Sequence, residues 1–236
     1  MAKMFGINMT VKQGWMKKAV ALLSEDLSET EYRNALEEHL KFELQSPTNI
    51  RKSREILMRI WFLDSDGVAG LQQEGRSLIQ KYPDYLTEIG WCMVPLAYPI
   101  FFDYAKTMGK MLSFDDIIST GQVKQKMFDE IGERVVIDTA TPKVITTMRE
   151  LGAVCTQKPG KHSSPHIPVK NSVIINFMIR AAMFLDGSSY YPYSSLTEFP
   201  FLFPFNFSVS KEQLMQDQRF KLSAFDATLS VALKKG

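Results

Sequence analysis

The chain has 236 residues, of which 45% are hydrophobic and 11% aromatic, and its 28 Lys and Arg residues nearly balance 26 Asp and Glu residues. This content is ample for a packed core and argues against an intrinsically disordered chain. The small net charge neither indicates nor excludes nucleic acid, because a binding surface needs clustered rather than excess charge.

The two cysteines, Cys92 and Cys155, are far apart in the sequence and predict a reduced intracellular protein with free thiols, not a disulfide scaffold. The longest apolar run, 91–102, contains two prolines and is too short to span a bilayer. The amino-terminal residues lack the continuous apolar stretch of a signal peptide. We therefore expect a cytoplasmic protein without a membrane partner.

Three helices are predicted in the first block, over residues 14–24, 28–44 and 47–62, because apolar residues recur there at helical spacing. Ser28 followed by Glu31 forms a capping box at the start of the second helix. The outer face of the third helix carries what we call the first basic stripe, Arg51, Lys52, Arg54 and Arg59. Exposed helices often carry such residues for solubility alone, so this stripe has two interpretations.

The centre of the chain is predicted to form a buried helical layer. Helical patterns cover 71–81, 84–97 and 99–111, followed by a short helix near Ser113 and another over 123–131. Residues 135–137 are interpreted as a bridging strand. Further along, 173–185 is apolar nearly all round, which predicts burial in the core or in an interface.

Residues 139–171 contain the strongest indication of function. A helix is predicted that starts at a Thr cap, with Pro142 in its first turn, and ends before Gly152. Its apolar face is formed by Val144, Ile145, Met148 and Leu151, which leaves on or near the other face Lys143, Thr146, Thr147 and Arg149. Small polar and basic side chains are therefore expected to face a partner.

A basic, hairpin-like loop follows this helix, with Lys158 and Lys161 on either side of a Pro-Gly turn. A helix followed by a basic hairpin is the order in which winged-helix modules present themselves to DNA. One feature departs from a helix-turn-helix: about eight residues are expected between this helix and the one before it, where three or four are usual.

The last fifty or so residues change character. Phenylalanines alternate strictly at positions 199–207, which is the period of a strand, but Pro200 and Pro204 indicate an edge strand or extended arm. A strand covering the core is favoured over a base-stacking arm. Two β-like runs follow, across a turn at Asp226.

These elements predict a mainly α (α+β) fold: a helical bundle with a winged-helix-like segment and a small carboxyl-terminal β appendage. The predicted divisions are an N-terminal helical bundle over 1–66, a helical core with the winged-helix-like segment over 67–187, and a Phe-rich arm with a small sheet over 188–236.

Catalytic and metal motifs are weak in this chain. It contains neither a G-x-S-x-G motif nor a glycine-rich phosphate loop, so we expect no enzyme and no cofactor. His162 and His166, with Cys155 upstream, have a spacing found in zinc sites, but loop histidines without a metal are favoured because no paired-cysteine knuckle accompanies them. Residues 64–67 resemble a fragment of a calcium loop and are interpreted as a turn.

Three segments resemble BrxA, the small helical protein of bacterial BREX phage-defence systems: ALEEHLKFELQSPTNIRKSREILMRIW (35–61), YPIFFDYAKTMGKMLSFDDI (98–117) and TPKVITTMRELGAV (141–154). The resemblance covers about residues 13–155, by pattern rather than identity. It implies a mostly helical protein with a likeness to the NusB antitermination fold that binds DNA without known catalysis. The matching positions are Arg51, Lys52, Arg54, Lys143, Thr147 and Arg149.

We therefore expect a non-catalytic protein that binds the phosphate backbone of double-stranded DNA alongside other defence-system proteins. The expected contacts are Arg51, Lys52, Arg54, Lys143, Thr147, Arg149, Lys158 and Lys161. The alternative is a protein-interaction or scaffold subunit. In that case the apolar helix 173–185 and the Phe arm would bury against partner proteins, and the basic faces would be solvated.

Overall fold

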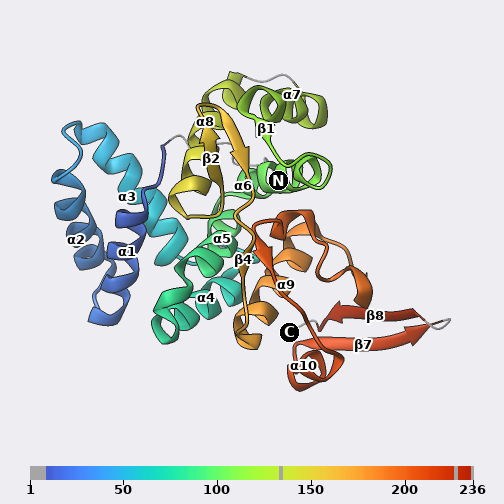
Figure 1. The fold of residues 1–236 in the computed structure, drawn as a ribbon. Helices are drawn as coiled ribbons and strands as arrows, with labels where there is room; N and C mark the ends of the chain where they lie inside the picture. The colour runs from blue at the N-terminus through green and yellow to red at the C-terminus, as the bar shows by residue number, and fades with distance from the viewer. Residues whose placement is uncertain (1–8, 133–134, 226–227, 235–236) are drawn as a thin grey trace.

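Helices dominate the structure (Figure 1), a computed structural model that describes residues 9–132, 135–225 and 228–234. None of the helices in these ranges is both long and apolar enough to cross a membrane. The α-helices are α1 (Gln13–Leu22), α2 (Glu29–Lys41), α3 (Pro47–Trp61), α4 (Ala69–Lys81), α5 (Leu86–Ala97), α6 (Pro99–Leu112), α7 (Thr120–Ile131), α8 (Val135–Glu150), α9 (Ser172–Asp186) and α10 (Lys211–Gln216).

The first three helices form a bundle, as their apolar periodicity predicts. The Ser28 side chain accepts a hydrogen bond from the backbone N–H of Glu31, and the Glu31 carboxylate accepts one from the backbone N–H of Ser28 at 2.9 Å, which is the predicted capping box. Tyr32, Leu36 and Leu40 recur along one face of α2 and are fully buried. α3 packs against α1, α2, α4 and α5, so it joins the bundle to the centre of the molecule.

The centre of the core is formed by α5, α6 and α9 around Trp91. The Trp91 indole N–H donates to the carbonyl of Phe201 at 2.9 Å, and the two rings stack with centroids 5.8 Å apart. The Phe segment therefore covers the core, as favoured. Of the predicted edge strand or extended arm, residues Pro200–Leu202 form a 3-10 turn, and β6 (Phe205–Asn206) is a short strand paired in parallel with β4 (Ile167–Pro168).

A second unit follows α6 and contains a small antiparallel sheet. Its strands are β1 (Ile118–Ser119), β2 (Cys155–Lys158) and β3 (Lys161–Ser163), in the spatial order β1-β3-β2. Two predictions are wrong in this region. Residues 113–116 form turns instead of a short helix, and residues 135–137 belong to α8 instead of a bridging strand.

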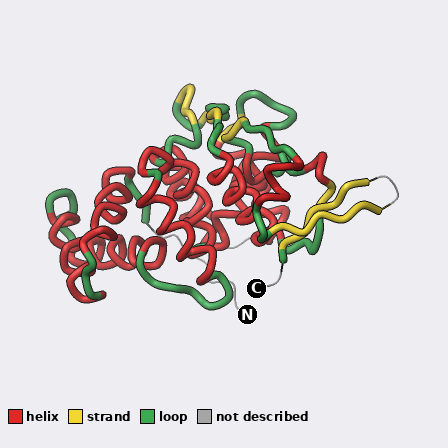
Figure 2. The backbone as a smooth tube through the Cα atoms, turned by 90° about the horizontal axis from the view of Figure 1, so that it is seen from below, coloured by secondary structure: helices red, strands yellow, loops and turns green. Residues whose placement is uncertain are grey.

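The carboxyl-terminal residues form a further sheet of β5 (Tyr191–Pro192), β7 (Phe220–Phe225) and β8 (Thr228–Leu233), in the order β5-β8-β7. The predicted pair of strands is confirmed, and the predicted turn at Asp226 lies outside the described residues. The β7–β8 hairpin extends away from the helices in both Figure 1 and Figure 2.

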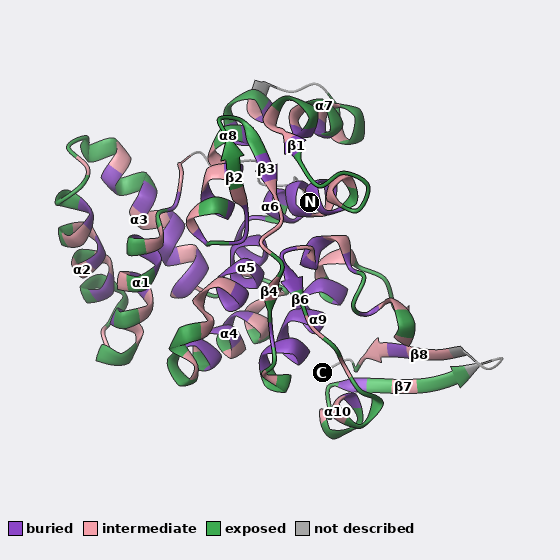
Figure 3. Cartoon of the chain, in the orientation of Figure 1, coloured by how far each residue is buried: buried purple, intermediate pink, exposed green. Residues whose placement is uncertain are grey.

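One hydrophobic cluster runs through the chain from Val11 to Val231. It crosses the predicted divisions at 66/67 and 187/188, and Figure 3 shows buried residues continuing from α3 through α5 to α9. The mainly α fold with small sheets is confirmed. The division into three domains stays a prediction.

Candidate nucleic-acid interface

The unit that begins with α6 has the element order of a winged helix, which is α6, β1, α7, α8 and then the β2–β3 hairpin. α7 ends at Ile131 and residue 135 already belongs to α8, so at most three residues separate the two helices. The expected separation of about eight residues is therefore wrong, and the spacing is that of a helix-turn-helix. Gly132 has φ +82°, a left-handed conformation that glycine adopts without steric cost at this turn.

α8 would be the recognition helix of such a unit. The predicted apolar face is confirmed, since Val144, Ile145, Met148 and Leu151 are all buried. Its end is also confirmed: Gly152 has φ +75°, and the N–H of Ala153 donates to the carbonyl of Met148 at 3.0 Å, which closes a Schellman motif.

The predicted start of this helix is wrong. Pro142 lies inside α8 instead of in its first turn, and neither Thr139 nor Thr141 caps the helix. The Thr141 hydroxyl donates instead to the carbonyl of Ile137 at 2.7 Å and lies 2.7 Å from the hydroxyl of Tyr104 on α6. Burial of Ile137 and Thr141 against α6 therefore extends the helix toward its N-terminus by about two turns.

Five cations of this unit have no ion pair or side-chain hydrogen bond with any residue that the structure describes: Lys126, Lys143, Arg149, Lys158 and Lys161. Arg149, Lys158 and Lys161 are exposed, and Lys143 is half-buried. We call Lys143 and Arg149 on α8, with Lys158 and Lys161 on the two sides of the hairpin turn, the wing surface. The turn itself is Pro159-Gly160, with Gly160 at φ +70°.

Thr147 does not belong to this surface, so its predicted exposure is wrong. Its side chain is fully buried, because the chain just before α1 covers this part of α8. The Thr147 hydroxyl donates to the carbonyl of Lys143 at 2.9 Å and accepts from the backbone N–H of Val11 at 3.1 Å. Thr147 therefore joins α8 to the N-terminal segment and is not available to a phosphate.

The residues of the first basic stripe differ in exposure and in pairing. Arg51 and Lys52 are exposed and form no ion pair or side-chain hydrogen bond within the described ranges. The side chain of Arg54, in contrast, is only 15% exposed and pairs with the carboxylates of Glu37 and Glu55. Both carboxylates occupy the guanidinium, so this geometry does not favour its predicted role as a phosphate contact.

The two basic regions lie in different parts of the molecule. The first stripe is on α3 in the N-terminal bundle, whereas α8 packs on α7 in the winged-helix unit, and Figure 1 shows the two helices separated. The structure therefore brings Lys143, Arg149, Lys158 and Lys161 into one unit but leaves Arg51 and Lys52 outside it.

His162 stabilises this unit from within. It is buried on β3, and its Nε2 atom is 2.9 Å from the hydroxyl of Thr120 at the start of α7. Burial lowers the pKa of His162, and the nearby positive charge of Arg149 lowers it further. His166 is exposed in a left-handed conformation, with φ +49°.

In the part of the chain that the structure describes, no group of three or more His, Cys, Asp or Glu residues could hold a metal ion. The buried thiol of Cys92 has its pKa raised by burial, so it is a poor nucleophile.

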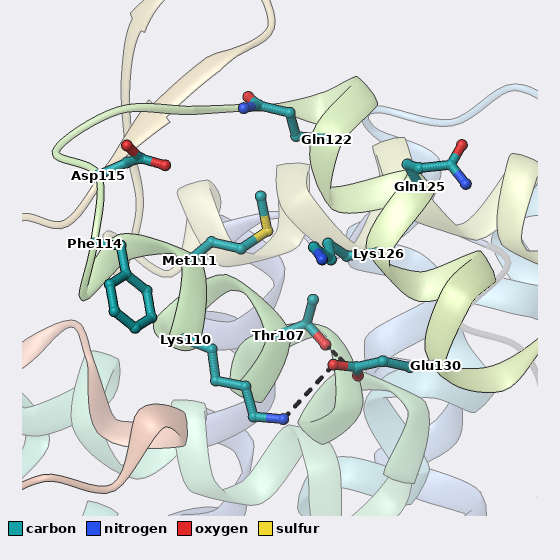
Figure 4. Close-up of a pocket in the computed structure, with 9 residues that line it drawn as sticks. All are labelled: Thr107, Lys110, Met111, Phe114, Asp115, Gln122, Gln125, Lys126 and Glu130. Atoms are coloured by element: carbon teal, nitrogen blue, oxygen red, sulfur yellow. Dashed lines mark hydrogen bonds and ion pairs between the residues drawn. The ribbon is translucent and has the colours of Figure 1, made fainter.

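A cleft of about 460 Å³ between α6 and α7 was not predicted from the sequence (Figure 4). At one end the Phe114 ring is 90% exposed. At the other end the Thr107 hydroxyl donates to the Glu130 carboxylate at 2.8 Å, and Lys110 lies 3.6 Å from the same carboxylate. Single exposed apolar side chains are common on protein surfaces, so Phe114 alone does not identify an interaction surface.

No family model, curated protein or solved structure matches the chain. The resemblance to BrxA stays a prediction, and function has to be inferred from the site.

Proposed function

We propose that this protein binds double-stranded DNA without catalysis, through the phosphate contacts of the wing surface. The observation that supports the proposal is the presence of four cations without carboxylate partners among the described residues, on a helix and hairpin that follow a short α7–α8 connection. The resemblance to BrxA favours a cytoplasmic subunit of a bacterial phage-defence assembly, in which other defence proteins would bind alongside DNA.

The charges suit a phosphate backbone. Lys and Arg side chains that have no internal carboxylate can replace the counterions condensed on DNA, and the release of those ions drives binding. The exposed Pro159-Gly160 turn adds the backbone N–H of Gly160, a group of the kind that also contacts phosphates. Such contacts position the protein on the duplex and carry no sequence information by themselves.

Fluorescence anisotropy of a labelled duplex, titrated at a series of salt concentrations, tests the proposal. The double variant Lys158→Gln, Lys161→Gln should weaken binding and flatten the slope of log affinity against log salt by about 0.9 for each lost phosphate contact. The single variants Lys143→Gln and Arg149→Gln should each have the same kind of effect. The matched control is Arg51→Gln with Lys52→Gln, which removes two exposed cations from α3 instead.

Equal salt slopes for the wild type and the wing variants would contradict the assignment to the wing surface. A slope that changes only in the α3 control would move the interface to the first basic stripe.

A wild type that fails to bind duplex at any salt concentration would favour the second candidate function, a protein-interaction subunit. The surfaces expected for that role, α9 and the Phe segment, are buried in the protein's own core. The exposed Phe114, with the half-exposed Ile117 three residues later, is the observation that supports it.

A further inference from the structure

The β7–β8 hairpin extends beyond the body of the protein and exposes one long edge (Figures 1 and 2). In the sheet order β5-β8-β7, β8 is central and β7 has no second neighbour among the described strands. β5 pairs with β8 only at residues 230–231. A two-stranded hairpin by itself is marginally stable in water, so the outer part of β7 and β8 lacks the support that sheets normally have.

The hydrogen bonds of β7 show which groups its free edge offers. The N–H of Lys234 donates to the carbonyl of Arg219 at 2.9 Å, so residue 219 is in a hydrogen-bonded pair with β8. Bonding alternates along an antiparallel strand, and the register is regular from residue 220 to 225. Residues 221 and 223 therefore bond inward to β8, whereas Leu222 and Ala224 direct their backbone N–H and C=O groups outward.

Most of the usual protections of an exposed edge are missing. Proteins protect edge strands with proline, a β-bulge, a covering element or charged side chains, lysine in particular. β7 has the sequence FKLSAF, with no proline and one charge, Lys221, and its pairing with β8 contains no bulge. The side chains of Leu222 and Leu229 are also only half-buried on the hairpin. This edge is suited to pairing with another strand.

We propose that the edge of β7 pairs with β7 of a second copy of this chain, in an antiparallel two-fold register centred on Ser223. In this register the backbone N–H and C=O groups of Leu222 form two hydrogen bonds with Ala224 of the second copy. By symmetry, Ala224 forms two hydrogen bonds with Leu222 of the second copy. Ser223 then faces Ser223 of the second copy across the axis. The same groups are contributed by both chains, as a two-fold interface requires.

The charge distribution favours a second copy. Lys221 lies opposite residue 225 of the second copy, so the two Lys221 side chains are separated by four residues along the strands and no like charges meet. Leu222 would lie beside Ala224 of the second copy, which continues the apolar face of each hairpin into the other. The result is a continuous sheet formed by both chains.

Disulfide trapping tests the register. In a background of Cys155→Ser, with Cys92 buried and unreactive, the variant Ser223→Cys should form a covalent dimer on mild oxidation. Residues that face each other in a non-hydrogen-bonded pair have Cα atoms about 4.5 Å apart, which a disulfide spans. The matched control is Lys221→Cys, whose two copies would be on the order of 14 Å apart and should stay monomeric on the same gel.

Light scattering on the eluted protein tests the assembly itself. The wild type should have twice the chain mass of 26.9 kDa. The variant Ala224→Pro should be monomeric with unchanged helical circular dichroism, because the lost N–H points away from β8. A monomeric wild type at every concentration tested, equal cross-linking of Ser223→Cys and Lys221→Cys, or a dimeric Ala224→Pro variant would each overturn the proposal. None of these outcomes depends on DNA binding.

Discussion

Gly109 on α6 lies where the Phe segment crosses the helix. A Cβ atom at this position would lie 1.8 Å from the carbonyl oxygen of Pro200. Neither backbone can move easily, because Phe201 beside it is fixed against Trp91. We expect Gly109→Ala to lower the free energy of unfolding by about 3 kcal/mol or more, as severe overpacking does.

Urea denaturation measures this loss. The matched control is Gly70→Ala on α4, where a Cβ atom would meet nothing within 4 Å. Alanine is a better helix former than glycine, so the control should be neutral or stabilising by up to about 1 kcal/mol. If the two variants have the same unfolding midpoint, the close approach at Pro200 does not exist in solution.

The individual site residues show how far the sequence can predict exposure. Helical periodicity identifies the apolar face of a helix, and for α8 it does so correctly. It does not say what covers the other face. Thr147 is covered by the segment containing Val11, and Arg54 by Glu37 of α2, and both neighbours come from distant parts of the chain. Arg149, Lys158 and Lys161 are exposed, as predicted, whereas Lys143 is half-buried.

Among the elements, those fixed by local sequence are the ones that were predicted well. The capping box at Ser28 and the apolar repeat of α9 depend only on residues close in sequence. The start of α8 could not be found in this way, because Pro142 and the two threonines resemble a helix N-terminus. Packing of Ile137 and Thr141 against Tyr104 outweighs that local pattern. The short α7–α8 connection cannot be found from local sequence for the same reason.

His162 connects two of these elements, since it joins β3 to the start of α7. Its pKa in the folded protein is below the usual 6.5, because burial and Arg149 both disfavour its charged form. The unfolded chain therefore binds more protons below pH 6.5, and His162 contributes stability above this pH that is lost as the pH falls toward its folded pKa.

We expect the variant His162→Gln to reduce this pH dependence, because glutamine can still bond Thr120 but does not titrate. Urea midpoints of the wild type and the variant, measured from neutral to mildly acidic pH, should converge as the pH falls below 6.5. Parallel curves over this range would show that His162 is not buried in its neutral form.

At the scale of the whole molecule, a network of charges attaches the carboxyl-terminal segment to the central helices. Arg180 on α9 donates to both carboxylate oxygens of Glu74 on α4, at 2.6 and 2.5 Å. Arg219, just before β7, donates to the same carboxylate at 2.5 Å and to Asp217 at 2.7 Å. The Arg180 side chain is only 5% exposed. The Glu74 carboxylate thus neutralises the buried Arg180 side chain and joins the predicted divisions 67–187 and 188–236.

Removing Glu74 tests whether the molecule folds as one unit. In Glu74→Leu, Arg180 keeps only Asp217, at 3.8 Å, as a carboxylate neighbour, and a buried charge that loses its partner costs about 3–5 kcal/mol. The control Arg219→Met removes a half-exposed partner of the same carboxylate and should cost about 1 kcal/mol or less. Because one hydrophobic cluster crosses both predicted boundaries, the whole protein should lose this stability in a single transition, seen alike by Trp fluorescence and by circular dichroism. If Glu74→Leu instead produced a separate early transition, the carboxyl-terminal segment would be an independent domain whose burial against Trp91 does not couple it to the helices.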